Sequence, residues 1–226
     1  MSPAASPTPP SASLQLDVFT LVPHAYAWLT EQRPVATVLG SELDLRLFSY
    51  RDTTPLRSGQ VDDEPYGGGA GMVLRVDVVA AALDTVYGGR PGHRVVALTP
   101  QGRQLTQELV EELAPEERLT VLSARYEGFD ERIVEHLCTD ALSIGPYVLS
   151  NGDLPAMVLV DALARRLPGA LAAGSGEVES FSPELEGRLE YPQYTRPAEF
   201  RGWRVPDVLL SGDHAVVERW RKEHVR

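Results

Sequence analysis

The feature that most constrains the fold is the stretch from Leu119 to Gly169, where turn-rich polar segments directly adjoin short apolar runs. Two of these segments read ARYEGFDER and SIGPYVLSNGDLP. A chain built only for stability would not place so many Gly, Pro, Asn and Asp residues beside its apolar runs. Loops that carry binding sites at the strand ends of α/β proteins have this pattern. We therefore expect the rest of the chain to support these two loops or to give access to them.

Short apolar runs alternate with segments of helical spacing, which predicts an α/β fold with a largely parallel sheet. The predicted strands cover residues 15–23, 43–50, 95–98 and 119–122, and residues 133–137 form a further apolar piece. The predicted helices cover residues 24–39, interrupted by Pro34, and residues 73–86, 105–113 and 157–167. From Tyr191 onward we expect extended pieces followed by a short basic helix.

A length of 226 residues suits one large domain with a small appendage. The net charge of −11 argues against a broadly basic nucleic-acid surface, although it leaves room for a local basic groove. No apolar run approaches the roughly 20 residues that cross a bilayer, so we expect no membrane association. The N-terminal MSPAASPTPPSAS has neither a basic start nor an apolar core, so it is not a secretory signal. We expect a cytoplasmic protein with a disordered tail.

Metal and disulfide chemistry have little support in the sequence. Cys138 is the single cysteine, which excludes an internal disulfide and a cysteine-rich metal site, and its apolar neighbours predict a buried, inert thiol. No histidine pair has metal-ligand spacing, and the acidic run from Asp62 to Glu64 is typical of a solvated turn. We therefore predict no metal site.

Two segments outside the opening stretch are candidates for ligand contact. Pro65–Met72 (PYGGGAGM) would let a backbone approach a ligand closely, but it is neither a dinucleotide fingerprint nor a P-loop. Thr99–Arg103 (TPQGR) follows a predicted strand, where its amides and hydroxyl could hydrogen-bond a purine edge or a ribose. A flexible loop and a helix-entry turn, respectively, explain the same residues.

The two turn-rich segments of the 119–169 stretch can likewise be interpreted either as ligand-binding loops or as loops without a ligand. The charges of Ala124–Arg132 either form a surface ion network worth little or belong to a site that follows a strand. The Ser143–Pro155 loop could hold an adenine with main-chain groups above an apolar floor of Ile144, Tyr147 and Leu149. A loop without a ligand is the alternative.

An acid–base pair is a further candidate. Glu179 lies in a linker of small residues, and Arg165 lies near the end of the preceding helix. A carboxylate in a mobile lid can act as a general base while an arginine balances developing negative charge. A solvated linker glutamate is the alternative.

Taken together and in this order, the motifs resemble the bacterial tRNA (guanine-N1)-methyltransferase family, known as TrmD. The resemblance covers about Leu16 to Arg221 and rests on eight blocks: VFTLVP, DDEPYGGGAGM, LTPQGRQLTQ, RYEGFDERI, SIGPYVLSNGDLPAM, ARRLPG, YPQYTRP, and LLSGDH followed by ERWR. Each block is short, and their shared order is what makes the resemblance specific.

The resemblance implies a SPOUT-type fold, in which a parallel sheet is followed by a C-terminal deep trefoil knot. Periodicity could not indicate a knot, since knots are almost absent from protein topologies. The resemblance also implies a homodimer with its pockets at the interface. We expect a disordered tail at 1–14, a knotted methyltransferase domain at 15–170, a flexible lid or linker at 171–183 and a small, shortened C-terminal domain with a truncated helical segment at 184–226.

The family binds S-adenosylmethionine in a bent conformation between three loops of the knot. Carried over by position, the cofactor-binding residues are Leu98, Thr99, Pro100, Gln101, Gly102, Ala124, Tyr126, Glu127, Gly128, Ser143, Ile144, Gly145, Pro146, Tyr147, Val148, Leu149, Gly152 and Pro155.

The resemblance also implies methyl transfer to N1 of the guanine on the 3′ side of the tRNA anticodon. Asp62 and Gly71 would contact this guanine. Glu179 and Arg165 match the family's catalytic pair. N1 of guanine carries a proton that must leave as the methyl group arrives, so a base is needed there, and the negative charge developing at O6 favours a nearby cation such as Arg165.

Four site positions depart from the family. The lid aspartate is Glu179 here, the glycine before RYEG is Ala124, and one of two paired glycines is Asn151. The aspartate of SIGDYVL is Pro146, which lacks both a carboxylate and an amide donor. The family also continues beyond the equivalent of Arg226 through helices that help hold tRNA.

Three functions are compatible with these residues. The first is a tRNA guanine-N1 methyltransferase, favoured because YPQYTRP and the guanine-facing loop are present. The second is a paralogue that methylates a guanine-containing small molecule or another nucleoside, in line with the shortened end and the acidic charge. The third is a cofactor-binding or RNA-binding protein without catalysis, against which the retained Arg165 and lid carboxylate argue.

Overall fold

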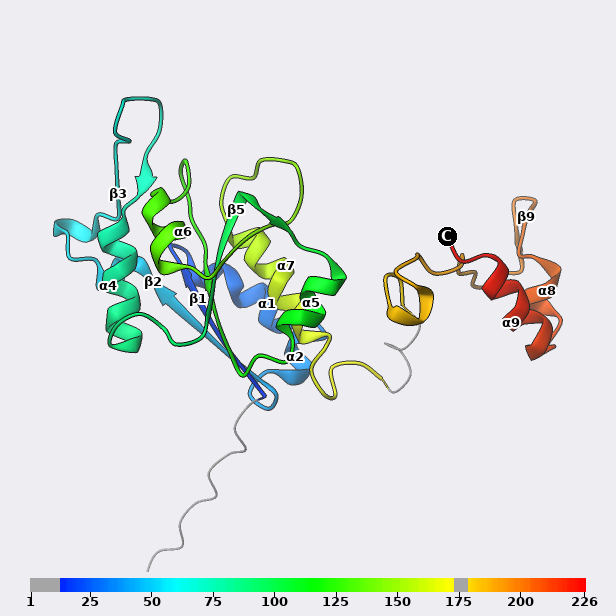
Figure 1. The fold of residues 1–226 in the computed structure, drawn as a ribbon. Helices are drawn as coiled ribbons and strands as arrows, with labels where there is room; N and C mark the ends of the chain where they lie inside the picture. The colour runs from blue at the N-terminus through cyan, green and yellow to red at the C-terminus, as the bar shows by residue number, and fades with distance from the viewer. Residues whose placement is uncertain (1–12, 173–178) are drawn as a thin grey trace, which may run out of the picture. The chain divides into compact units, whose positions relative to one another are not determined.

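The computed structural model describes residues 13–172 and 179–226. The chain divides between Ala170 and Leu171 into two compact units. We call them the core unit and the C-terminal unit, and Figure 1 shows the elements of both. Residues 1–12 of the predicted N-terminal tail and residues 173–178 of the predicted 171–183 linker lie outside the described residues.

The core unit is built on a five-stranded parallel sheet in the order β2-β1-β6-β5-β7. Its strands are β1 (Leu14–Thr20), β2 (Leu43–Ser49), β5 (Arg94–Gln104), β6 (Arg118–Leu122) and β7 (Asp140–Ser143). Central strands of such sheets are buried on both faces and read as continuous apolar runs, which explains why β1 and β6 are almost wholly buried. The prediction of an α/β fold with a parallel sheet is confirmed.

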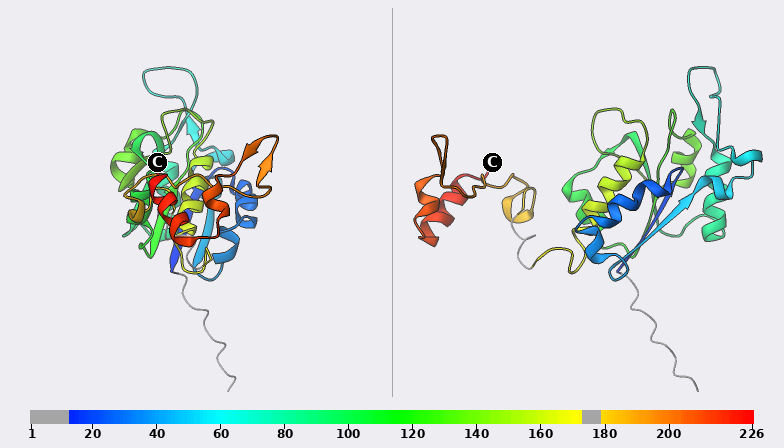
Figure 2. Two further views of the ribbon diagram at one scale, coloured as in Figure 1. Left: turned by 90° about the vertical axis from the view of Figure 1, so that its right-hand side faces the viewer. Right: turned by 180° about the vertical axis from the view of Figure 1, so that it is seen from behind.

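Helices cover both faces of this sheet. In Figures 1 and 2, α4 (Val76–Tyr87) and α6 (Glu131–Leu137) lie on one side, and α1 (Ala27–Glu31), α5 (Gln107–Leu113) and α7 (Asp153–Ala164) lie on the other. The shorter helical elements are η1 (Pro23–Tyr26), α2 (Val35–Val38), α3 (Tyr50–Thr53) and η2 (Arg57–Gly59). Within the described residues, no helix combines the length and the apolar character that a bilayer-spanning segment requires.

Three local structures differ from the sequence prediction. Val73 and Leu74 do not begin a helix but form β4 (Val73–Leu74), which pairs antiparallel with β3 (Asp62–Asp63). Tertiary pairing overrides local spacing here, because the amide of Leu74 donates to the carbonyl of Gly128 at 3.0 Å. The apolar piece at 133–137 belongs to helix α6, and β7 is a strand that the sequence did not indicate.

Asp17 and Cys138 are two of the titratable groups that are buried in the core unit. Asp17 on β1 has an exposed fraction of 0% and accepts two hydrogen bonds from the Arg46 guanidinium, at 2.6 and 2.7 Å. Burial alone would raise the pKa of this carboxyl, but hydrogen bonds from Arg46 and Tyr87 lower it overall. Cys138 is buried as predicted, and burial raises the pKa of its thiol to about 12, so it is unreactive near neutral pH.

The C-terminal unit contains little regular structure. Its elements are η3 (Pro183–Leu185), the hairpin of β8 (Glu199–Phe200) and β9 (Trp203–Arg204), and the helices α8 (Asp207–Leu210) and α9 (His214–Glu223). Asp213 caps α9 by accepting hydrogen bonds from the amides of Ala215 and Val216. Leu189 and Arg226 exchange two main-chain hydrogen bonds of 2.7 and 3.0 Å, which fasten the end of the described chain to its own unit.

Candidate active site

A cavity of about 200 Å³ lies beside the neighbouring strands β6, β5 and β7. Its walls come from three segments, residues 98–101, 124–134 and 142–155. Loops that follow parallel strands meet at one edge of a sheet, so segments that are far apart in the sequence converge here. Both turn-rich segments of the 119–169 stretch contribute to the walls.

Almost all residues predicted to bind the cofactor line this cavity; the exceptions are Gly102 and Pro146. A Cβ added at Gly102 would lie 2.4 Å from the main-chain carbon of Ala141 and the amide nitrogen of Leu142. The close approach of β7 therefore requires this glycine, whether or not a ligand is near. Pro146 is exposed on the loop that follows β7.

The first wall is an excursion within β5. Leu98 and Arg103 both pair with Leu142 of β7, so the four residues between them leave the ladder before pairing resumes. Thr99, Pro100 and Gln101 are thereby displaced over the cavity. The predicted loop after Leu98 exists, but it is an insertion in a strand and not the entry to a helix.

The second wall is the loop after β6, which main-chain hydrogen bonds tie to the 72–74 segment. Glu127 donates to Met72 at 2.9 Å, and Asp130 donates to Leu74 at 3.0 Å. Tyr126 has a φ of +63°, a left-handed conformation that costs a non-glycine residue on the order of 1 kcal/mol and is concentrated at functional sites. The surrounding hydrogen bonds hold this unfavourable conformation in place.

The two residues predicted to contact the target guanine, Asp62 and Gly71, adjoin the 72–74 segment to which this loop is hydrogen-bonded. Gly71 has a φ of +87°, and a Cβ added there would lie 2.3 Å from Oε1 of Glu127. Gly71 therefore packs directly against a side chain of the cavity wall. Asp62 pairs with Leu74 across the β3–β4 ribbon. Neither residue lines the cavity itself.

The third wall is the loop after β7. Gly152 donates from its amide to the carbonyl of Ala124 at 2.7 Å, and a Cβ there would lie 3.0 Å from the Ala124 amide nitrogen. The second and third loops are thus in direct contact, and the methyl group of Ala124 is buried at this contact. Among the described residues, the main-chain amides of Val148 and Leu149 donate to no protein group, which leaves them available to a ligand.

A buried carboxylate that sequence analysis did not single out anchors the third loop. Asp153, at the start of α7, is 3% exposed and accepts hydrogen bonds from the hydroxyls of Thr20, Tyr26 and Ser123. Burial and this carboxylate raise the pKa of Tyr26 well above its ordinary value. The main-chain amide of Asp153 donates to Oδ1 of Asn151 at 2.9 Å. Asn151 therefore has a structural role that a glycine could not supply.

Six further residues line the cavity that were not named individually as cofactor-binding, although four of them lie in the candidate segments Ala124–Arg132 and Ser143–Pro155: Arg125, Phe129, Glu131, Val134, Leu142 and Asn151. All six lie within the 119–169 stretch, so their position in the sequence was the available signal. The walls now combine the carboxylates of Glu127 and Glu131 with apolar side chains such as Leu98, Ile144 and Leu149. This combination suits a ligand that has a cationic group and a flat, weakly polar ring.

Arg165 and Glu179, the predicted catalytic pair, belong to different units. Arg165 caps the C-terminus of α7 in the core unit. Glu179 lies in the C-terminal unit, where its carbonyl accepts a hydrogen bond from the Ser182 amide at 3.0 Å. Their pairing remains a prediction.

Comparison with known proteins supplies a family. Residues 14–226 match the family model described as tRNA (Guanine-1)-methyltransferase TrmD. The chain is 48% identical over 216 residues to a tRNA (guanine-N(1)-)-methyltransferase of Brevibacillus brevis, which covers 94% of this chain and 87% of that protein. Proteins of the same name from Geobacillus kaustophilus and Dehalococcoides mccartyi are 46% and 44% identical, covering 94% and 93% of this chain and 87% and 85% of their own lengths.

Proposed function

The chain belongs to the tRNA (guanine-1)-methyltransferase family TrmD, and on this premise we propose that it methylates N1 of guanine in tRNA, with S-adenosylmethionine as methyl donor. The target would be the guanine on the 3′ side of the anticodon, and the enzyme would act in the cytoplasm. The cavity lined by residues 98–101, 124–134 and 142–155, which we call the three-loop cavity, carries the proposal, because the resemblance to the family places the cofactor in these segments.

The residues of the cavity fit this cofactor. S-adenosylmethionine combines a sulfonium cation, an α-amino group and an adenine ring. The carboxylates of Glu127 and Glu131 suit the cationic groups, and Leu98, Ile144 and Leu149 provide an apolar surface for the ring. The amides of Val148 and Leu149 would donate to its polar edge. When bound, the cofactor would supply an electrophilic methyl group.

Two side chains of this protein would then act on the guanine. Glu179 would accept the N1 proton as general base, a role typically worth about 10²- to 10⁴-fold in rate. Arg165 would stabilise the negative charge that develops at O6. Glutamate is one methylene longer than aspartate, so Glu179 would reach N1 from a slightly more distant backbone position.

The guanine would be held by the segment that carries Asp62 and Gly71. Gly71 packs against the Glu127 side chain, and three main-chain hydrogen bonds join residues 72–74 to residues 127–130. Because of this junction, the guanine-facing segment and a wall of the cofactor cavity would move together. This arrangement would align the methyl donor with its acceptor.

We further propose a homodimer and a trefoil knot, both of which the family resemblance implies. Leu154 and Val158 lie one turn apart on α7 and are 52% and 46% exposed. Helical spacing places Asp161 and Arg165 on the same stripe, and burial raises the pKa of Asp161. A second copy covering this stripe would bury the two apolar side chains and bring partner residues to Arg165.

The decisive experiment is methyl transfer from radiolabelled S-adenosylmethionine to an unmodified tRNA with guanine after the anticodon. The control is the same tRNA with adenine at that position. We expect incorporation into the first tRNA only, and mapping of the product should identify 1-methylguanine. Equal incorporation into both tRNAs, or into neither while calorimetry shows cofactor binding, would contradict the proposed substrate.

A further inference from the structure

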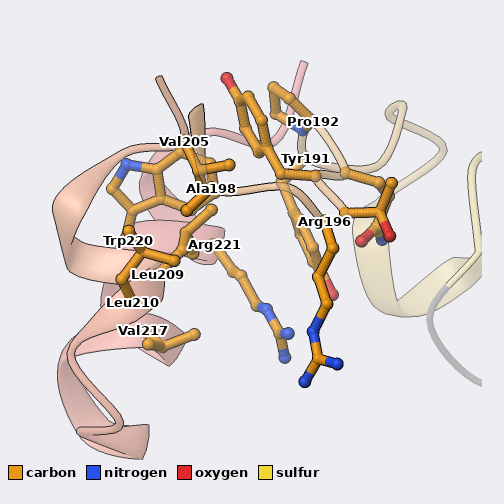
Figure 3. Close-up of a pocket in the computed structure, with 13 residues that line it drawn as sticks. Tyr191, Pro192, Arg196, Ala198, Val205, Leu209, Leu210, Val217, Trp220 and Arg221 are labelled. Atoms are coloured by element: carbon orange, nitrogen blue, oxygen red, sulfur yellow. The ribbon is translucent and has the colours of Figure 1, made fainter. Parts of the chain in front are cut away.

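A second cavity lies wholly within the C-terminal unit, and the proposed methyl transfer does not use it. Its volume is about 460 Å³, within the roughly 300–1,000 Å³ typical of ligand pockets. The segment 191–198 forms one side, and α8 and α9 form the other (Figure 3). The side chains that matter here are Tyr191, Tyr194, Arg196, Trp220 and Arg221.

Aromatic rings form one surface of this cavity. The rings of Tyr194 and Trp220 meet at an angle of 60° with their centroids 6.3 Å apart. Trp220 is also stacked on His224, at 4.1 Å between centroids, which restrains its orientation. Tyr194 is 49% exposed. Half-exposed rings in a concave site offer a stacking platform for a flat ligand ring.

Two guanidinium groups lie beside the rings. The Arg221 guanidinium lies 5.0 Å from the centroid of the Tyr191 ring. In Figure 3 the side chains of Arg196 and Arg221 extend toward the same side of the cavity. In the part of the chain that the structure describes, neither forms an ion pair, whereas Arg204 of the same unit pairs with Glu199 at 3.5 Å. Arg196 and Arg221 can therefore bind an anion without first losing a carboxylate partner.

An aromatic platform beside two unpaired arginines is the chemistry that recognises an unstacked nucleotide, with the base on the rings and the phosphate on the cations. We propose that this cavity binds one unpaired nucleotide of the RNA substrate, distinct from the guanine that is methylated. The inference rests on the proposed function, since it takes the substrate to be RNA.

The test measures the Kd of the full-length protein for unmodified tRNA by fluorescence anisotropy over a series of salt concentrations. Tyr194→Ala should raise Kd about tenfold, because a stacking partner is lost, while Tyr194→Phe should stay within about twofold of the unsubstituted protein. Arg221→Gln should raise Kd by a similar factor and reduce the slope of log Kd against log salt by about one. In turnover assays, these substitutions should raise KM for tRNA and leave kcat unchanged.

Arg219→Gln is the matched control. Arg219 lies on the same helix and carries the same charge, but it does not line the cavity. A purely long-range electrostatic effect would change Kd equally for Arg219→Gln and Arg221→Gln. Because the proposed site contacts the RNA through Arg221, we expect Arg219→Gln to change Kd by less than about twofold. A single-stranded hexanucleotide should show the same ranking of variants as tRNA, and a blunt duplex of that length should not.

The outcomes separate this inference from the proposed function. If the protein transfers no methyl group to tRNA but Tyr194→Ala still weakens RNA binding, the proposed function fails and the nucleotide site stands. If methyl transfer occurs but Kd is the same for all variants, the nucleotide site is overturned. It is also overturned if Tyr194→Ala dissociates a dimer in sedimentation experiments without changing RNA affinity, because the cavity would then be a subunit contact.

Discussion

The core unit and the C-terminal unit differ most in how much apolar surface they bury. In the core unit, Leu14, Leu16, Val18 and Phe19 of a single strand are completely inaccessible to solvent. Between Glu186 and Arg226, no side chain that the structure describes is buried. Burial of apolar surface is the dominant favourable term in folding. The core unit therefore carries most of the free energy of unfolding.

This difference indicates a division of labour. Regions with few buried contacts open at low free-energy cost, and binding elements that must rearrange are usually drawn from them. The rings and arginines of the C-terminal cavity are half-buried or exposed in such a region, while the three-loop cavity is built on the buried sheet. Substitutions in each unit test this difference in burial.

The largest expected effect concerns the proposed general base, Glu179. Glu179→Gln should lower kcat at least a hundredfold, because the amide cannot accept the N1 proton. Calorimetry should show unchanged cofactor affinity, since the cavity lies in the core unit. Single-turnover methyl transfer is the measurement, with Glu184→Gln in the same unit as the control. Undiminished turnover would remove Glu179 from the mechanism.

A matched pair of leucines tests the burial contrast directly. Leu119→Ala, at a completely buried position on β6, should lower the free energy of unfolding by about 2–5 kcal/mol. Leu210→Ala, at a position 53% exposed on α8, should cost less than about 1 kcal/mol. Native-state hydrogen exchange, followed peptide by peptide, reports on each unit separately. Equal losses in the two variants would contradict the contrast.

The same contrast applies to ion pairs. Asp17→Asn should destabilise the core unit by roughly 3 kcal/mol, since it leaves Arg46 without its buried carboxylate. This is the low end of the usual range, because the Arg46 side chain is about one-third exposed. Glu199→Gln, which removes an exposed pair with Arg204 in the C-terminal unit, should change stability by less than about 1 kcal/mol. Urea unfolding of the two variants measures the difference.

The smallest expected effect is a pH dependence confined to the core unit. The pKa of Asp17 is lower in the folded protein than its ordinary value. Its contribution to stability is therefore complete above the unfolded-state value of about 4 and is lost as the pH falls through the lower, folded-state pKa. Urea midpoints between pH 6 and pH 3 should fall less steeply for Asp17→Asn than for the unsubstituted protein. Parallel curves would exclude Asp17 as a source of acid sensitivity.

Much of the core unit was predictable from local patterns. The alternation of Leu43–Tyr50 predicted β2, and the leucines of residues 105–113 predicted α5. The elements that were not predicted correctly depend on contacts between distant segments. Residues 73–74 have helical spacing but pair with β3, and β7 is only four residues long and holds its place through β5. Local spacing contains no information about such partners.

The candidate site also contains residues that the sequence could identify and residues that it could not. Resemblance to the family identified most wall residues of the three-loop cavity, because wall residues occur in contiguous motifs. It could not separate Gly102, which the packing of two strands requires, from glycines that face a ligand. Nor could it indicate Asp153, whose partners Thr20 and Ser123 are far away in the sequence.

The contact between Gly71 and Glu127 has a consequence for anyone who would redesign this protein. A library that varies residue 71 to alter the choice of base would, with every side chain larger than hydrogen, displace a carboxylate of the neighbouring cavity. Selectivity for the acceptor and affinity for the donor would then change in the same clone. To change acceptor selectivity without changing donor affinity, positions 71 and 127 would have to be varied together, because a side chain at residue 71 displaces the carboxylate of Glu127.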